Sequence, residues 1–263
     1  YPDVVLVSII TDMLEDMLKF NDNNKLLKRV QTILEFRKVK KLYKTVDKFV
    51  LLTSNMADRI PEAKDKYCVI EGIAIIKPFP DKPKQTNYKP LLYTGTLEEF
   101  SGVRDLLQGF MLTQAEDYRL VICGKGVLTP IIESAAQKDK RIIYKGLVSR
   151  EEVLSLQEEA TVLINPRKPD NEITRYSFPS KTMEYLTSGT PMIGYKLEGI
   201  PNEYYQYFYC VEDLSTEALA QVIDDTMSLP ISELKNNAKK AYDSIIENKT
   251  SAIQVRKLIN FIS

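Results

Sequence analysis

The sequence of 263 residues contains no histidine. This absence excludes histidine bases, Ser-His-Asp triads and nearly all zinc sites from the chemistry of the chain. Cysteine is also scarce: Cys68, Cys123 and Cys210 each lie in a separate strand-like apolar segment, and none belongs to a paired motif. Buried free thiols are the interpretation that this spacing favours.

Long apolar runs and an excess of either charge are missing too. The longest apolar runs, residues 4–10 and 49–52, are far shorter than the roughly 20 residues that cross a bilayer, and no cleavable signal is visible. Lys plus Arg and Asp plus Glu both number 36, so net charge attracts neither nucleic acid nor an anionic membrane. We expect a cytoplasmic protein. A location at the inner face of the membrane stays open.

What the sequence does contain is an α/β pattern. With 44% hydrophobic residues and 27% charged residues, the chain can build packed cores. Short β-branched runs alternate with helical periodicity, which is typical of parallel sheets. The expected strands lie at residues 4–10, 49–53, 67–70, 91–93, 120–123, 142–144 and 162–164.

The domain boundary is predicted at a proline-rich stretch, residues 77–88, whose composition suits an exposed linker. Two lobes, 1–76 and 89–230, would flank it, and helices in 231–263 would pack back toward the first lobe. Residues 26–46 carry apolar side chains near helical spacing, which predicts a long amphipathic helix that serves either lobe packing or a partner.

Two glycine turns are candidate phosphate sites. The run LLYTGTL at residues 91–97 is a strand that ends in a glycine turn before a helix near Gly102, and exposed amides at such a turn can hold a phosphate. An ordinary turn explains one glycine equally well. The second turn, Gly124-Lys125-Gly126, has Thr129 where a dinucleotide fingerprint needs its third glycine, so a nicotinamide-dependent enzyme is disfavoured.

The most informative stretch is SFPSKTMEYLTSGTPMI, residues 177–193. We expect a helix that starts at Ser177 or Pro179 and ends at Gly189. Lys181 and Glu184 are three residues apart and share a helix face, so one could meet a phosphate while the other accepts ribose hydroxyls. An exposed ion pair between them is the alternative.

Together with YTGTL, ICGKG and RIIYKGLVSREEVLSLQEEATVLINP, that stretch resembles the donor lobe of GT-B glycosyltransferases, most closely glycosyltransferase family 4. The motifs run in the family's order through nearly all of residues 89–230. Residues 1–76 are similar to the closing segment of the acceptor lobe. The resemblance therefore implies that the chain, which opens at Tyr1, is the later part of a longer protein.

The resemblance also implies the site. Glu184 matches the family's ribose-binding glutamate, whereas its partner glutamate falls on Tyr176, and the family's two diphosphate-binding basic residues fall on Thr96 and Ser101. We therefore expect Lys181 and Arg175 to supply the positive charge, with Arg167 a weaker candidate. The residues expected to carry the reaction are Glu184, Lys181 and Arg175, and those expected to bind the donor are Gly95, Thr96, Gly124, Leu147, Val148, Tyr176, Ser177, Phe178, Pro179 and Ser180.

The implied reaction is a retaining, metal-independent transfer of a hexose from a nucleoside diphosphate sugar, UDP being the expected nucleotide, to an acceptor hydroxyl in surface polysaccharide synthesis. No cofactor and no nucleic acid is expected. The partners would be the donor and a sugar or lipid-linked acceptor, and the isolated fragment is expected to be inactive. The alternatives are a non-catalytic scaffold that binds nucleotide sugars and a GT-B sugar-nucleotide epimerase, which the absence of histidine disfavours.

Overall fold

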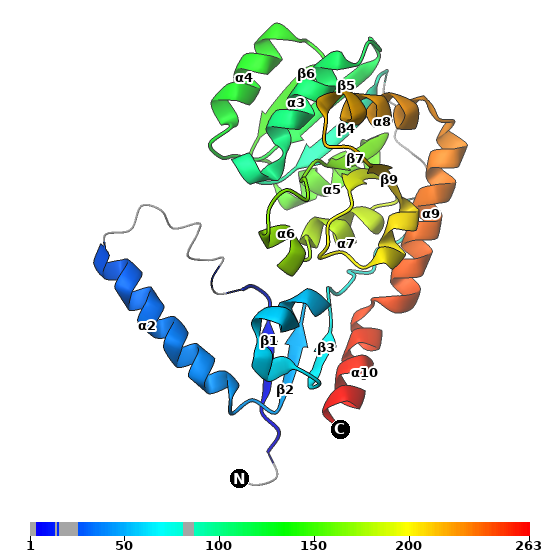
Figure 1. The fold of residues 1–263 in the computed structure, drawn as a ribbon. Helices are drawn as coiled ribbons and strands as arrows, with labels where there is room; N and C mark the ends of the chain where they lie inside the picture. The colour runs from blue at the N-terminus through cyan, green and yellow to red at the C-terminus, as the bar shows by residue number, and fades with distance from the viewer. Residues whose placement is uncertain (1–3, 14, 16–25, 81–86) are drawn as a thin grey trace.

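The computed structural model describes residues 4–13, 15, 26–80 and 87–263 and contains two parallel sheets (Figure 1). The first sheet has three strands in the order β1-β2-β3, all parallel. These strands are β1 Val7–Ile10, β2 Lys48–Leu51 and β3 Tyr67–Val69. They match the three strands predicted for the first lobe, although each is shorter than expected.

The predicted helix between β2 and β3 is replaced by two short 3-10 helices, Ser54–Arg59 and Pro61–Ala63. Pro61 explains the interruption, because proline lacks the amide hydrogen that a continuing helix needs. Met56 and Ile60 from this segment are buried beneath the sheet with Phe49 and Leu51. The first lobe therefore has its own small apolar core.

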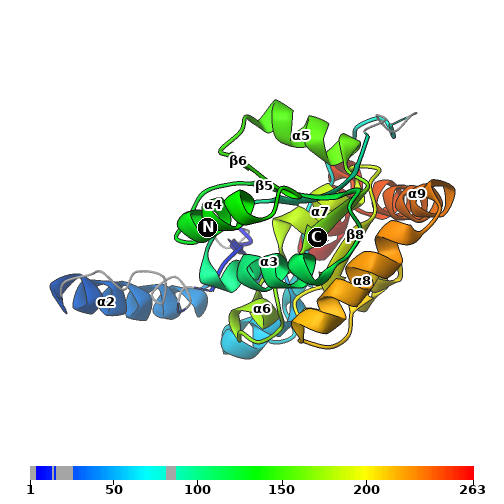
Figure 2. The same cartoon turned by 90° about the horizontal axis from the view of Figure 1, so that it is seen from above.

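The long helix forms as α2, Leu26–Tyr43, and stands apart from both sheets in Figures 1 and 2. Leu34 and Leu42, which were expected on its apolar face, are exposed by 51% and 61%. The side chains of residues 26–32 lie outside the description. Among the described side chains of α2, the predicted apolar face is therefore uncovered.

The second sheet has six parallel strands in the order β6-β5-β4-β7-β8-β9. Its middle strands are almost wholly buried, as in sheets that helices cover on both faces. The order reverses between β4 and β7, and ligands of such sheets bind in the crevice outside the carboxyl ends at this point. The strands are β4 Lys89–Thr94, β5 Tyr118–Cys123, β6 Ile142–Gly146, β7 Val162–Asn165, β8 Met192–Tyr195 and β9 Phe208–Val211.

Helices cover both faces of this sheet. Figure 2 shows α5 on one side of it and α3, α4 and α8 on the other. Two of these helices begin at a serine cap: Ser149 accepts from the Glu152 amide at the start of α5, and Ser215 accepts from the Ala218 amide at the start of α8. The helices are α3 Val103–Leu112, α4 Thr129–Lys138, α5 Arg150–Glu159 and α8 Thr216–Ser228.

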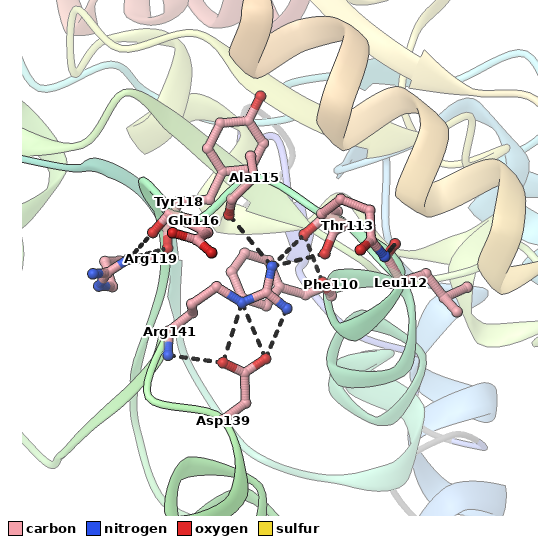
Figure 3. A network of polar contacts seen from close by, with 10 residues as sticks. Phe110, Leu112, Thr113, Ala115, Glu116, Tyr118, Arg119, Asp139 and Arg141 are labelled. Carbon is pink, nitrogen blue, oxygen red and sulfur yellow. Dashed lines mark hydrogen bonds and ion pairs between the residues drawn. The ribbon is translucent and has the colours of Figure 1, made fainter.

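A network around Arg141 closes the amino-terminal edge of the second sheet (Figure 3). The Arg141 guanidinium donates to both oxygens of Asp139 and, at 2.7 Å, to the carbonyl of Thr113, and it lies 5.1 Å from the ring centre of Phe110. Its hydrogen bonds lower the pKa of Asp139. Because the carboxyl ends of the strands lie at the opposite edge, this network serves stability.

Two helices carry the chain back to the first lobe: α9, Ile231–Asn248, and α10, Ser251–Ile262 (Figure 1). The predicted linker runs alongside α9 before residues 81–86, which lie outside the description. Tyr242 donates to the carbonyl of Lys77, and its ring packs against that of Phe79 at 5.3 Å. Lys48 of β2 donates to the carbonyl of Phe261, which joins α10 to the first sheet.

A buried ion pair holds the crossing point of the two lobes. Glu71, which follows β3, accepts from Lys249 at 2.5 Å and from the Tyr204 hydroxyl at 2.7 Å. Lys249 also pairs with Glu203 at 2.8 Å. The side chains of Glu71 and Lys249 are exposed by only 3% and 14%, so each charge depends on the other.

We predict that Lys249→Met lowers the free energy of unfolding by about 3 kcal/mol, because it leaves the buried Glu71 carboxylate without its cation. Urea unfolding at pH 7 measures the change. The matched control is Lys239→Met, which removes an exposed lysine paired with Asp243 on α9 and should cost less than about 1 kcal/mol. Equal losses in the two variants would contradict this account of the crossing point.

Candidate functional site

The site begins where two glycine turns meet at the carboxyl edge of the second sheet. Gly95 follows β4 and Gly124 follows β5, and the Gly95 amide donates to the carbonyl of Cys123 at 2.9 Å. A Cβ on Gly124 would lie 1.7 Å from the carbonyl oxygen of Gly95, and both residues have positive φ, +149° and +142°. Only glycine fits this contact.

Lys181 lies against the first turn. It sits on α7, Ser180–Leu186, and a Cβ on Gly95 would lie 1.8 Å from Lys181 Nζ. The ammonium donates to the Tyr93 hydroxyl at 3.4 Å, and that hydroxyl donates to the carbonyl of Thr96 at 2.7 Å. Burial, opposed by Glu184 and aided by the nearby Arg167, lowers the pKa of Lys181 to about 8. The desolvated ammonium of Lys181 therefore lies against the Gly95 turn.

Glu184 lies one helical turn beyond Lys181 and has a fixed carboxylate. Gln157 Nε2 donates to its Oε1 at 2.5 Å, and Arg150 Nη1 lies 2.5 Å from its Oε2. Gln157 is 1% exposed, and its backbone carbonyl accepts from Thr190, so it is rigid, whereas the Arg150 side chain is 56% exposed. A ligand hydroxyl would therefore displace Arg150 more readily than Gln157.

Two cavities flank these residues. One of about 310 Å³ lies over the glycine turns, and Leu147 and Val148 form its wall together with Lys125 and Val153. The other, of about 230 Å³, lies beside Glu184 between α5, α7, the first-lobe residue Ile73 and the linker residue Pro78. The predicted donor residues Gly95, Thr96, Gly124, Leu147 and Val148 thus share the first cavity, and Ser180 and Glu184 share the second.

Arg175 is not among the residues that line these two cavities, and its expected role at a diphosphate stays a prediction. It lies on the unexpected short helix α6, Ile173–Tyr176, where it pairs with Asp58 at 3.1 Å and with Glu198 at 3.4 Å. These two carboxylates neutralise its charge. Asp58 belongs to the first lobe, so Arg175 joins the two lobes.

Tyr176 also departs from the expected donor contact. It is 7% exposed and belongs to the apolar core of the first lobe, with Phe49 and Met56. The Arg59 guanidinium lies over its ring at 3.8 Å. Apolar burial and the cation over the ring both hold Tyr176 in this core.

The remaining predicted residues, Ser177, Phe178 and Pro179, lead into α7. Ser177 donates to the carbonyl of Ile173, and Pro179, one of the two predicted starts, directly precedes the helix, which ends at Leu186 rather than at Gly189. Phe178 is buried against the ring of Tyr204, with centres 5.6 Å apart, rather than lining a cavity. It is a core residue.

Three residues of the site were not predicted: Tyr93, Arg150 and Gln157. Tyr93 was assigned only to a strand, and burial raises its pKa to about 12, so it stays a protonated hydrogen-bond partner. Arg150 and Gln157 lie on α5, and the residue pattern of this helix does not distinguish them from ordinary surface positions. Their link to Glu184 is a tertiary contact that sequence spacing does not report.

Across the described ranges, no group of three or more acidic or cysteine side chains is arranged to hold a metal ion. In the same ranges no helix has the length and apolar content needed to span a bilayer.

The match to a family model identifies the chain. Residues 88–228, more than half of the sequence, match the model described as "Glycosyl transferases group 1". The chain belongs to this family, and the predicted family resemblance is confirmed. None of the curated proteins matches the sequence significantly.

Solved structures with the same fold are GT-B glycosyltransferases. A mutant of S. aureus TarM in complex with UDP is 14% identical, with a TM-score of 0.71, and covers 86% of this chain and 46% of its own. Anabaena Alr3699/HepE in complex with UDP is 12% identical (TM-score 0.67, covering 97% and 72%). A glycosyltransferase from Rickettsia africae is 18% identical (TM-score 0.64, covering 86% and 66%).

These likenesses confirm the predicted α/β architecture with GT-B type lobes. The chain spans about half the length of the TarM chain.

The lowered pKa of Lys181 predicts a pH-dependent stability. Between about pH 8 and pH 10 the unfolded chain keeps this proton while the folded chain has lost it, so the free energy of unfolding rises with pH in this window. Lys181→Met removes the effect. In urea unfolding at pH 7, 8, 9 and 10, the variant should be more stable than the natural chain at pH 7, and the difference should shrink by up to about 1.4 kcal/mol per pH unit. A constant difference would mean that Lys181 is solvated.

Proposed function

We propose that this chain contains the donor-binding lobe of a retaining glycosyltransferase that moves a hexose from a nucleoside diphosphate sugar to an acceptor hydroxyl. The observation that carries the proposal is the convergence of the Gly95 turn, Lys181 and Glu184 at the switch point of the six-stranded sheet. The turn and the lysine suit a diphosphate, and the carboxylate suits the ribose hydroxyls.

In the proposed reaction, negative charge develops on the diphosphate as the bond to the sugar breaks. Lys181 is desolvated, so its ammonium stabilises this charge more than an exposed lysine would. Glu184, held by Gln157, fixes the ribose and thereby the position of the sugar's reacting carbon. The proposal includes neither a metal nor a protein nucleophile.

UDP is the proposed nucleotide, because UDP is bound in the TarM and HepE structures that share the fold. Surface polysaccharide synthesis in the cytoplasm is proposed on similar support: WaaG is described as "a glycosyltransferase involved in lipopolysaccharide biosynthesis" and WaaB as a "lipopolysaccharide outer core galactosyltransferase". The acceptor is proposed to be a sugar or a lipid-linked sugar.

A non-catalytic scaffold that binds nucleotide sugars is the second candidate. The placement of Tyr176 in the first-lobe core and of Arg175 in ion pairs favours it, because the Tyr176 ring is not free to hold the donor sugar and the Arg175 charge already has two carboxylate partners. The two candidates predict the same nucleotide binding. They differ in turnover: hydrolysis or transfer of the sugar by the full-length protein supports the enzyme, and binding without either supports the scaffold.

We predict that one of UDP, GDP and ADP binds with micromolar affinity and that Glu184→Ala weakens this binding about 10- to 100-fold, the effect of losing a charged hydrogen-bond acceptor for the ribose. Calorimetric titration measures both. The control is Glu158→Ala, which removes an exposed carboxylate beside the same cavity and should change affinity less than about twofold. Absence of binding by all three nucleotides would contradict the proposal.

A further inference from the structure

Arg167, the weaker of the cations that the sequence suggested for the diphosphate, lies next to the proposed site and has no part in the site as described so far. It follows Pro166 at the carboxyl end of β7, the strand that pairs with β4 at the switch point. The turn at Gly102 fixes its backbone: a Cβ there would lie 2.0 Å from the Pro166 carbonyl oxygen and 3.1 Å from the Arg167 amide nitrogen. This close contact holds the backbone of Arg167 in a fixed position.

The Arg167 side chain is half-buried, and its Nε is fully buried. This Nε has no hydrogen-bond partner among the described residues, and the guanidinium centre lies 5.7 Å from the ring centre of Phe100. Burial lowers its pKa, an effect that Tyr93 and Asp170 oppose. No ion pair within 4 Å involves Arg167 in the described part of the chain, and Asp170 is exposed.

Two neighbouring cations, unlike Arg167, have a carboxylate partner. Lys168, the next residue, pairs with Asp105 at 3.0 Å, and Arg150 pairs with Glu184 at 2.5 Å. Within the described residues, Lys181 resembles Arg167: its one hydrogen bond is to the neutral Tyr93 hydroxyl, and it has no ion pair. Two desolvated cations thus lack carboxylate partners on the same edge of the sheet.

Arg167 acts electrostatically on Lys181 and lowers its pKa. Tyr93 interacts with both cations: the Lys181 ammonium lies 4.5 Å from its ring centre, and the Arg167 charge opposes the rise in the pKa of its hydroxyl. Glu184, the carboxylate that acts on Lys181, already has Gln157 and Arg150 on its oxygens. Like charges held together out of water are costly unless a ligand supplies the opposite charge.

We infer that Arg167 and Lys181 together bind the diphosphate of the donor, with Arg167 as a binding residue in its own right. A ligand with at least two negative charges matches the pair, and the cavity of about 310 Å³ over the Gly95 turn, against which Lys181 lies, has room for it. This inference rests on the proposed function and identifies which cations serve it. Arg167 is then the second cation at the diphosphate, in place of Arg175, which pairs with Asp58 and Glu198.

The test uses the 263-residue chain with inorganic pyrophosphate, UDP and UMP as probes in calorimetric titrations. Arg167→Gln should weaken binding of pyrophosphate and of UDP at least tenfold and that of UMP less than threefold, because UMP lacks the second phosphate. Arg167→Lys keeps the charge and should recover part of the loss. The matched control is Arg104→Gln, which removes an exposed arginine paired with Glu99 in the same lobe and should change these affinities less than twofold.

Thermal unfolding gives a second measurement that does not depend on the nucleotide. Without ligand, Arg167→Gln should melt no earlier than the natural chain, because it removes an uncompensated charge. Pyrophosphate should raise the melting temperature of the natural chain and leave that of the variant unchanged. A variant that melts several degrees earlier without ligand, or that pyrophosphate stabilises as much as the natural chain, would overturn the inference.

The outcomes separate the inference from the proposed function. If UDP binds the natural chain and Arg167→Gln equally, Arg167 is not a diphosphate ligand, and the proposed function stands. If UMP and UDP weaken equally in Arg167→Gln, the residue acts on the nucleoside, and the inference again fails. If UDP, GDP and ADP all fail to bind the natural chain, the proposed function fails as well.

Discussion

The backbone contact between the Gly95 and Gly124 turns is the constraint on which the rest of the candidate site depends. A side chain on Gly124 would collide with the Gly95 carbonyl, and one on Gly95 would occupy the place of the Lys181 ammonium. The contact is possible because β4 and β5 are parallel and in register, so both strands end at the same edge of the sheet. Tyr144 from β6 donates to the Gly124 carbonyl at 2.8 Å and adds a third strand to the arrangement.

The helix α7 adds charged side chains, Lys181 and Glu184, beside these glycine turns. Its buried Tyr185 hydroxyl lies 3.3 Å from the Thr94 amide and 3.1 Å from the Thr94 hydroxyl, which ties the helix to the end of β4. Lys181 and Glu184, which precede that anchor on the same helix, are therefore placed by the core. The environment then sets their chemistry, because burial makes the Lys181 charge costly without a ligand and valuable with one.

The sequence predicted the three strands of the first sheet, the strands β4 to β7 of the second and the residues nearest the glycine turns, because apolar periodicity and glycine are local signals. It did not predict the partners of the site. Gln157 meets Glu184 across 27 positions, and Arg175 meets Asp58 across 117, distances over which a single sequence carries no pairing signal. The error on Tyr176 has the same origin. Its place in a motif indicated a ligand contact, whereas the first lobe takes its ring into an apolar core.

The two lobes are joined at places of very different strength. At the crossing point, Glu71, Lys249 and Tyr204 are buried, and breaking such a pair leaves an unpaired charge out of water. On the other side, Asp58 and Arg175 are exposed by 57% and 44%, and such a pair contributes less than about 1 kcal/mol. The buried Tyr176 ring under Arg59, the Arg59–Glu172 ion pair and the hydrogen bonds from Asn55 add further contacts there. Because α6 carries these contacts and leads into Lys181 and Glu184, a movement between the lobes would be felt beside the candidate site.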